Sequence, residues 1–307
     1  AVAFSAAVDI QGGYANGGGA PYDGVVDAGG GGNWTTAQAG DNALSDAGLS
    51  STDYTMLIKS GGYSTLTVDT DDAYIFVEPG ATFSGAIVLS GANITLVTAG
   101  NVAISGTVTL SGANCEFLAH GKTTTAGLIM TGAGGFHDGG GEGTVHDGGT
   151  ANDGIDMGDG CRVQNCTVGS TSGGSYVAID AEDAHNAWLA NVRVTDSGGD
   201  GVVITGNDFY MSGCDIRNAD GVGIQVNSPR VRCIGNYIRS NVTGVGINIA
   251  STGDGFVGTS NTVDSNGTAL VIHADAENAL WVGNKTDGAV TESSGTSTFA
   301  NNEETAF

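Results

Sequence analysis

Apolar and polar residues alternate along most of this chain, in short runs that glycines separate. An apolar period of two predicts β-strands, whereas an amphipathic helix would show a period near 3.6 residues. Typical runs read GIDM from residue 154, GVVI from 201 and GIQV from 223, and each is followed by a second short strand. The pattern therefore predicts a protein built from many short strands.

These strands recur at a regular interval. The segment SGAIVLSGANITL at 84–96 closely matches SGTVTLSGANCEF at 105–117, and the offset between the two is 21 residues (105 − 84). Self-similarity at a period of about 20–50 residues is typical of solenoids. Because the apolar spacing within each unit is two, we predict a β-solenoid of stacked coils.

One inward position of the second strands predicts a buried column. In successive coils this position holds Cys166, Val192, Cys214, Asn236, Asn261 and Asn284. Equivalent residues of neighbouring coils lie about 4.8 Å apart, so each Asn amide can bond the next one. Such bonds satisfy amides that are otherwise costly to bury. We therefore expect a structural column that points inward in one stack.

The first quarter of the chain carries a family resemblance. Residues 22–63 are predicted to form a strand, a glycine turn, a helix at about 34–47 and a strand ending in GGY. This order resembles the opening of the right-handed β-helices of the pectin lyase-like superfamily, through Val25, Val26, Gly29–Gly32, Trp34, Thr35, Thr36, Ile58, Gly61 and Tyr63. The resemblance implies an all-β, right-handed parallel β-helix of roughly ten coils. The helix would cap its open N-terminal end.

From this pattern we expect three regions. Residues 1–63 would form the N-terminal segment and cap, 64–290 the β-helix coils, and 291–307 a C-terminal tail.

Composition and charge narrow the classes of partner that this protein can bind. The chain has 54 glycines and 3 prolines, which indicates many turns, and 33 Asp and Glu against 9 Lys and Arg give a net charge of −24. This charge repels nucleic acid phosphates and anionic membrane surfaces, so we expect neither partner. Nor does any apolar run approach the roughly 18 residues of a membrane helix. The cysteines follow no metal-ligand spacing, and we predict buried free thiols at Cys115, Cys161, Cys166, Cys214 and Cys233.

Catalytic motifs of the resembled superfamily are incomplete here. That superfamily includes pectin esterases, polysaccharide lyases, glycoside hydrolases and non-enzymatic viral spikes, so the fold does not settle the activity. Asp71, Asp72 and His120 match only fragments of polygalacturonase motifs, in the wrong order. Arg230 and Arg232 could be nominated as the base of a lyase, but Cys233 and the strand pattern around them fit an ordinary coil.

Paired acids and outward aromatic residues are the remaining candidates. Stacked coils would place two carboxylates side by side on one face, as glycoside hydrolysis requires, and the catalytic candidates are Asp156, Asp180 and Glu182. With Asp this abundant, such a pair also arises by chance. Aromatic side chains that point outward would form a ridge for a glycan or a neighbouring subunit, and the candidates are Trp188, Tyr210, Tyr237 and Trp281.

A glycine-rich stretch at 134–149, GGFHDGGGEGTVHDGG, repeats His-Asp-Gly-Gly. The mostly glycine spacing between His137 and His146 gives neither imidazole a rigid support, and Asp-Gly pairs are ordinary turn residues. We predict a surface loop or irregular coil in which these histidines do not converge on one ion. We expect no cofactor other than a structural Ca²⁺, for which the oxygen ligands would be Asp138, Glu142 and Asp147.

Three functions fit these features. The first is a virion surface spike or tail-fibre-like homo-oligomer, by resemblance a trimer, that binds host surface polysaccharide without cleaving it. The second is a polysaccharide depolymerase, either a glycoside hydrolase or a lyase, which would use the acidic candidates. The third is a secreted surface adhesin of a salt-adapted microbe. The incomplete catalytic motifs favour a non-enzymatic protein at a virion surface or outside a cell.

Overall fold

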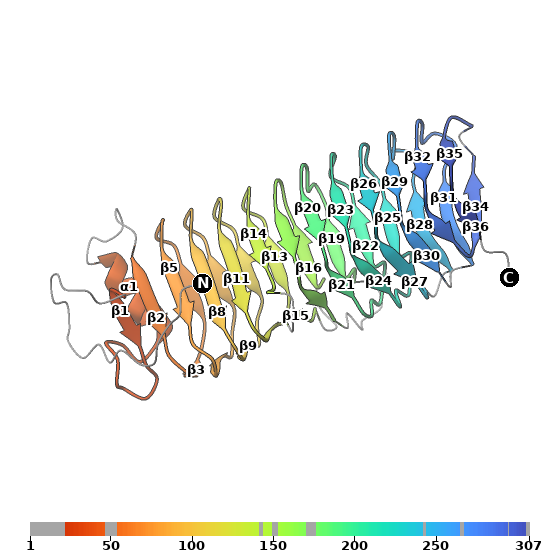
Figure 1. Ribbon diagram of the computed structural model, residues 1–307. Coiled ribbons are helices and arrows are strands. Elements are labelled where there is room, and N and C mark those ends of the chain that lie inside the picture. Colours follow the sequence, from red (N-terminus) through yellow and green to blue (C-terminus); the bar gives the residue numbers. More distant parts are fainter. Residues whose placement is uncertain are drawn as a thin grey trace.

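The computed structural model describes residues 22–46, 54–140, 144–148, 153–169, 176–241, 244–264, 267–293 and 295–304. These residues form an elongated stack of β-coils, with the single helix at the N-terminal end and the last strands at the other end (Figure 1). Three parallel sheets, A, B and C, contain 13, 12 and 11 strands in this part of the chain. The predicted all-β parallel β-helix is therefore confirmed.

The chain passes through sheets A, B and C in turn, once per coil. Sheet A contains β1 (Gly24–Val26), β2 (Thr55–Ile58), β5 (Tyr74–Val77), β8 (Thr95–Ala99), β11 (Glu116–His120), β14 (Phe136–Asp138), β17 (Arg162–Gln164), β20 (Trp188–Ala190), β23 (Tyr210–Ser212), β26 (Arg232–Ile234), β29 (Val257–Thr259), β32 (Leu280–Val282) and β35 (Thr298–Ala300). Sheet B contains β3 (Gly61–Tyr63), β6 (Ala81–Phe83), β9 (Val102–Ile104), β12 (Thr123–Thr125), β15 (Val145–His146), β18 (Thr167–Val168), β21 (Arg193–Val194), β24 (Asp215–Arg217), β27 (Tyr237–Arg239), β30 (Thr262–Asp264), β33 (Lys285–Thr286) and β36 (Glu303–Glu304). Sheet C contains β4 (Leu66–Val68), β7 (Ile87–Leu89), β10 (Val108–Leu110), β13 (Leu128–Met130), β16 (Ile155–Met157), β19 (Ile179–Ala181), β22 (Val202–Ile204), β25 (Ile224–Val226), β28 (Val245–Ile249), β31 (Thr268–Ile272) and β34 (Ala289–Glu292).

The stack of strands extends beyond the region expected for the coils. Strands β1 to β3 lie within the expected cap segment, and β35 and β36 lie within the expected tail, where they pair with β32 and β33. Phe299 takes the register position of the inward Trp281, although it is 37% exposed at the end of the stack. Residues 63 and 290 therefore do not mark ends of the stacking, which runs from β1 to β36.

The helix α1 (Ala37–Asp46) covers the N-terminal end of the stack, where it packs against β1, β2 and β4 (Figure 1). It begins after Thr36, whose Oγ1 accepts a hydrogen bond from the Ala39 N–H at 3.2 Å, the bond expected of an N-cap. Leu44, on the inner side of this helix, is fully buried. Gly40 permits the close approach, since a Cβ there would lie 2.7 Å from Val26 Cγ2. Among the described residues no helix is long and apolar enough to cross a membrane.

The predicted inward column is confirmed. Its Cys and Asn members are all at least 95% buried, and the amides bond from coil to coil. Asn236 Nδ2 donates to Asn261 Oδ1 at 3.1 Å, and Asn261 Nδ2 donates to Asn284 Oδ1 at 2.9 Å. Asn302, which the sequence pattern did not include, extends the ladder by accepting from the Asn284 N–H at 3.0 Å.

A left-handed residue precedes each column member at the corner between sheets A and B. These corner residues have φ angles from 53° to 65°, and they are Asn165, Asn191, Gly213, Gly235, Ser260 and Gly283. Asn and Gly are the residues that adopt this conformation most readily. The turn directs the following side chain into the interior, which explains why the column is in register.

All five cysteines are buried and free, as predicted. Burial raises the pKa of the Cys214 thiol to about 12, and it also raises the pKa of Cys115 and Cys161.

Candidate functional site

Five outward side chains form a line across sheet A. Phe136, Arg162, Trp188, Tyr210 and Arg232 occupy one register position on β14, β17, β20, β23 and β26. Four strand spacings of about 4.8 Å give this line a length of roughly 19 Å. We call these five residues the arginine-aromatic column.

The centre of the column is an exposed aromatic pair. Trp188 is 40% exposed, and its ring meets Tyr210 edge-on, with centroids 5.6 Å apart and an interplanar angle of 79°. Arg162 lies over the opposite side of the pair, with its Cζ 5.9 Å from the Trp188 ring centroid. A surface hollow of about 430 Å³ opens here, and it is lined by Arg162, Asn186, Ala187, Trp188, Asp208 and Tyr210.

Positive charge is concentrated beside this hollow. Arg230 makes a two-point ion pair with Asp208, with both nitrogen to oxygen distances at 2.7 Å. The hydrogen bond from Arg230 holds the pKa of Asp208 below its usual value. Arg162 and Arg232 form no ion pair with any residue in the described ranges. Their guanidinium groups therefore remain available as donors in a molecule with only 9 Lys and Arg.

The four aromatic residues predicted from the sequence do not form one ridge. Trp188 and Tyr210 lie side by side on sheet A. Tyr237 is outward on β27 of sheet B, where its hydroxyl donates to Asp264 Oδ2 at 3.0 Å. Trp281 is 1% exposed and points into the interior. Sequence reasoning did not single out Phe136 and Arg162, and it considered Arg232 only as a lyase base. All three share the offset of Trp188 from the inward apolar residue of the strand.

The acidic candidates lie on another sheet. Asp156 on β16 and Asp180 on β19 are partners in neighbouring strands of sheet C, and Glu182 follows β19 as an exposed residue. Burial, with the charges of Asp153, Asp156 and Glu182, raises the pKa of Asp180 to about 6. Burial also raises the pKa of Asp156. Because these acids belong to sheet C, they do not line the hollow on sheet A.

Replacing Asp180 with asparagine is expected to stabilise the protein above pH 6. The folded-state pKa of about 6 lies above the unfolded value of about 3.9, so the stabilising neutral form is lost as the pH rises through 6. Asp180 is only half-buried, and after solvent screening we expect a gain on the order of 1 kcal/mol at pH 8 and none at pH 4. Urea unfolding at both pH values measures this difference.

The exposed Asp275 provides the control, since Asp275→Asn should leave the unfolding midpoint unchanged at both pH values. An equal effect of Asp180→Asn at pH 4 and pH 8 would contradict the assigned shift.

The glycine-rich stretch contains two inward histidines. His137 on β14 and His146 on β15 are fully buried, and their Nε2 atoms are 2.9 Å apart. The prediction that this stretch forms a surface loop or irregular coil is wrong at both histidines, which lie on paired strands. Their support comes from strand pairing, since His137 pairs with Phe117 and Val163 in sheet A. Together with Cys166 they form a group whose ligand atoms all lie within 4.8 Å of one another.

Two acids of that stretch, Asp138 and Asp147, lie within the described residues. Asp138 accepts hydrogen bonds from the Gly140 N–H, Asn165 Nδ2 and Gln164 Nε2 at 2.9 to 3.0 Å. Burial alone would raise its pKa, but these bonds outweigh burial and lower it. Asp147 is exposed just after β15, and Glu142 lies outside the described residues.

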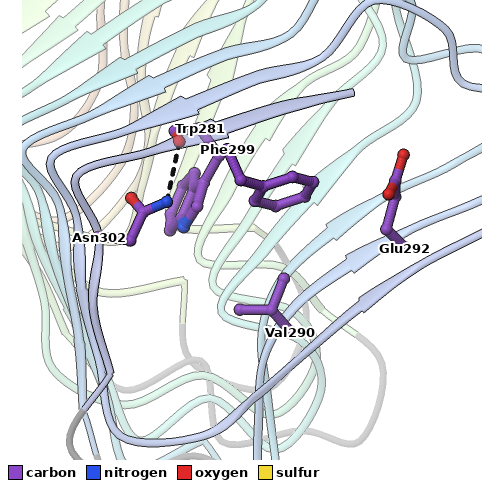
Figure 2. Close-up of a pocket in the computed structure, with 5 residues that line it drawn as sticks. All are labelled: Trp281, Val290, Glu292, Phe299 and Asn302. Carbon is purple, nitrogen blue, oxygen red and sulfur yellow. Dashed lines mark hydrogen bonds between the residues drawn. The ribbon is translucent and has the colours of Figure 1, made fainter. Parts of the chain in front are cut away.

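A second hollow, of about 260 Å³, lies at the C-terminal end of the stack. Figure 2 shows that Trp281, Val290, Glu292, Phe299 and Asn302 surround it, with Asn302 Nδ2 donating to the Trp281 carbonyl at 3.0 Å. Its apolar residues are the inward residues of the last coils, which are left partly open where the stacking ends.

Comparison with known proteins supports the fold. A family model described as a right-handed β-helix region matches residues 143–303, more than half of the chain. No curated protein matches in sequence. The A-module of mannuronan C-5 epimerase AlgE6 from Azotobacter vinelandii shares 15% identity at a TM-score of 0.53, over 88% of this chain and 94% of that one.

Two other solved structures align less closely. ORF18 of Geobacillus virus E2 has 10% identity and a TM-score of 0.44, over 81% of this chain and 52% of that chain. The periplasmic alginate epimerase AlgG has 12% identity and a TM-score of 0.37, over 82% and 76%. At these identities the likeness concerns the fold alone.

Proposed function

Because the chain belongs to the right-handed β-helix family, we propose that it is a surface spike or tail-fibre-like protein that binds a host glycan along sheet A without cleaving it. Its place would be a virion surface or the outside of a cell. The acidic coat of net charge −24 would keep such a protein soluble in saline media.

The arginine-aromatic column carries this proposal. Aromatic rings supply flat apolar surfaces with little conformational freedom to lose, and they suit the apolar faces of sugar rings. Trp188 and Tyr210 lie at its centre, and the free guanidinium groups of Arg162 and Arg232 flank them. Guanidinium forks bind carboxylates at two points. The column therefore suits a chain of carboxylated sugars that lies across the strands.

The position of the acidic candidates supports binding without cleavage. Glycoside hydrolysis needs two carboxyl groups flanking the bond that breaks. Asp156 and Asp180 face outward from sheet C, whereas the column faces outward from sheet A. A glycan on the column would therefore not meet this acidic pair.

Replacing Trp188 with alanine is expected to weaken glycan binding about tenfold or more, because truncating a central aromatic anchor costs on the order of 2 kcal/mol. Calorimetric titration with mannuronate and galacturonate oligosaccharides, and with neutral maltohexaose, measures the loss. The titration is run near 0.15 M salt, where screening limits repulsion from the acidic surface to about 8 Å.

Tyr74→Ala is the matched control, because Tyr74 is an exposed aromatic residue at the same register position of sheet A, far from Trp188 in the stack. It should leave the affinity unchanged. If none of these saccharides binds, or if both variants bind as the parent protein does, the proposal fails.

A depolymerase is the second candidate, and the raised pKa of Asp180 favours it. A carboxyl group with a pKa of about 6 beside a second carboxyl group suits a general acid. In that case the protein would release reducing ends from the same oligosaccharides, and Asp180→Asn would abolish the release. We expect no release from either protein.

A further inference from the structure

Two imidazoles and one thiol meet inside the solenoid, at the corner between sheets A and B. His137 belongs to β14, His146 to β15, and Cys166 follows β17 in the next coil. Both histidines are fully buried and Cys166 is 5% exposed. The imidazole rings meet edge-on with centroids 4.8 Å apart. The three ligand atoms lie within 4.8 Å of one another, although the residues come from two sheets and two coils.

Hydrogen bonds at the two Nδ1 atoms hold the imidazoles so that their Nε2 atoms face each other. His137 Nδ1 is 2.9 Å from the Phe117 carbonyl oxygen, which can only accept, so Nδ1 carries the proton and Nε2 keeps its lone pair. His146 Nδ1 is 2.8 Å from Thr125 Oγ1, a hydroxyl that can donate or accept, so in the metal-free protein His146 Nε2–H can donate to His137 Nε2 at 2.9 Å. Histidines that bind metals are usually held through the other ring nitrogen by such an oxygen.

The thiol faces this pair without another partner. The Sγ atoms of Cys115, Cys161 and Cys214 reach carbonyl oxygens at 3.1 to 3.5 Å. Within the described ranges, the Sγ atoms of Cys166 and Cys233 make no hydrogen bond, and of these two only Cys166 lies beside the histidines. Gly139 leaves room for Cys166, since a Cβ at Gly139 would lie 2.6 Å from Cys166 Cβ.

We propose that His137 Nε2, His146 Nε2 and Cys166 Sγ bind one transition-metal ion, either Zn²⁺ or Cu⁺. Imidazole and thiolate ligands select these ions, whereas Ca²⁺ and Mg²⁺ need oxygen ligands. Zn to nitrogen bonds of about 2.0–2.1 Å at a tetrahedral ion would place the two Nε2 atoms roughly 3.3 Å apart, so the 2.9 Å pair opens only slightly. Binding releases the thiol proton to solvent, and the proton that His146 Nε2 donates to His137 Nε2 in the metal-free protein moves to His146 Nδ1, where Thr125 Oγ1 accepts it.

This ion would link two coils at a place where the amide ladder is absent. From Asn236 to Asn302 the interior of this corner is joined by side-chain amides, whereas the sequence between β14 and β15, GGGEGT at 139–144, contains no Asn or Gln. The metal would connect sheet A, sheet B and the next coil through three bonds. This site lies in the interior and does not depend on the glycan-binding proposal for the outer face of sheet A.

Refolding with cobalt tests the site, because a buried site must be loaded as the chain folds. The full chain, without a histidine tag, is unfolded, reduced and refolded anaerobically with one equivalent of Co²⁺, and parallel samples receive Zn²⁺ or Cu⁺. We expect one ion per chain after gel filtration and a sulfur-to-cobalt charge-transfer band. Loss of that band when Zn²⁺ or Cu⁺ is added shows which of these ions displaces Co²⁺ from the site.

Matched variants locate the ligands. Cys166→Ala and His146→Gln should lose the band, whereas Cys214→Ala, a change at an equally buried position of the same column, should keep it. If a ligand variant does not fold, X-ray absorption of the loaded parent protein must show two imidazole nitrogens and one sulfur around the metal. Refolded parent protein with less than half an ion per chain, a band that survives Cys166→Ala, or a shell without sulfur would overturn the proposal.

Discussion

Replacing Trp281 with alanine is expected to lower the free energy of unfolding by about 3–5 kcal/mol, the usual cost of removing a fully buried large aromatic side chain. Trp281 is 1% exposed, and its ring stacks near Phe256 with centroids 6.5 Å apart. The ring occupies the space beside Gly258, where any Cβ would collide with it. The Trp281 Nε1 has no hydrogen-bond partner among the described residues, so the loss comes from packing.

The loss of stability in Trp281→Ala should be concentrated in the C-terminal coils, because each coil of a solenoid contacts only its neighbours. Urea unfolding gives the free-energy change, and hydrogen exchange should show lost protection in β29 to β36. Leu280→Ala is the control, since Leu280 is the adjacent, partly exposed residue on the same strand and should cost about 1 kcal/mol or less. Equal costs for the two variants would contradict the inward position of Trp281.

Replacing Asn261 with alanine is expected to cost about 3 kcal/mol, because it interrupts the amide ladder at its middle. Asn261 Oδ1 accepts from the Asn236 N–H at 3.0 Å and from Asn236 Nδ2 at 3.1 Å. Asn261 Nδ2 donates to the Cys233 carbonyl at 2.8 Å. Each buried group left without its partner costs about 1–3 kcal/mol, and Asn261 is only 1% exposed.

Asn248→Ala separates the effect of the ladder from that of losing any asparagine. Asn248 is a partly exposed residue of sheet C that donates to Gln225 Oε1 at 2.7 Å. Its loss should cost about 0.5–1 kcal/mol, the net value of one accessible hydrogen bond. If Asn261→Ala costs no more than this control in urea unfolding, the ladder is not the stabilising element described above.

The repeating part of the fold could be predicted from the sequence because every coil obeys the same alternation. The amide column emerged from stacking the coils at one inward position, and the bonds from Asn236 to Asn284 confirm that register. The binding candidates required a finer distinction. In AWLANV at 187–192 the tryptophan precedes the inward residue, whereas in ALWVGN at 279–284 it is the inward residue. A shift of one residue moves a side chain to the other face, so Trp188 is outside and Trp281 inside.

The histidine group could not be predicted from local sequence. Flanking glycines indicated a flexible turn, yet His146 pairs with Thr125 and Val168 in sheet B, far from either in the chain. Cys166 reaches the same point from the next coil. Contacts that depend on stacking between coils appear only when the register of all three sheets is known. For Arg162 and Arg232 the outward position can be inferred from the offset within each strand, but their place on either side of the aromatic pair depends on the stacking of four strands.

Acrylamide quenching of tryptophan fluorescence tests the glycan-binding column most directly. Of the three tryptophans, only Trp188 is strongly exposed, because Trp281 is buried and Trp34 is packed against the core. Acrylamide is uncharged, so the acidic surface does not repel it. We predict that a saturating carboxylated oligosaccharide removes most of the quenchable fluorescence of the parent protein and leaves that of Trp188→Phe unchanged. A saccharide that binds by calorimetry while the quenching of Trp188 stays the same would contradict the account.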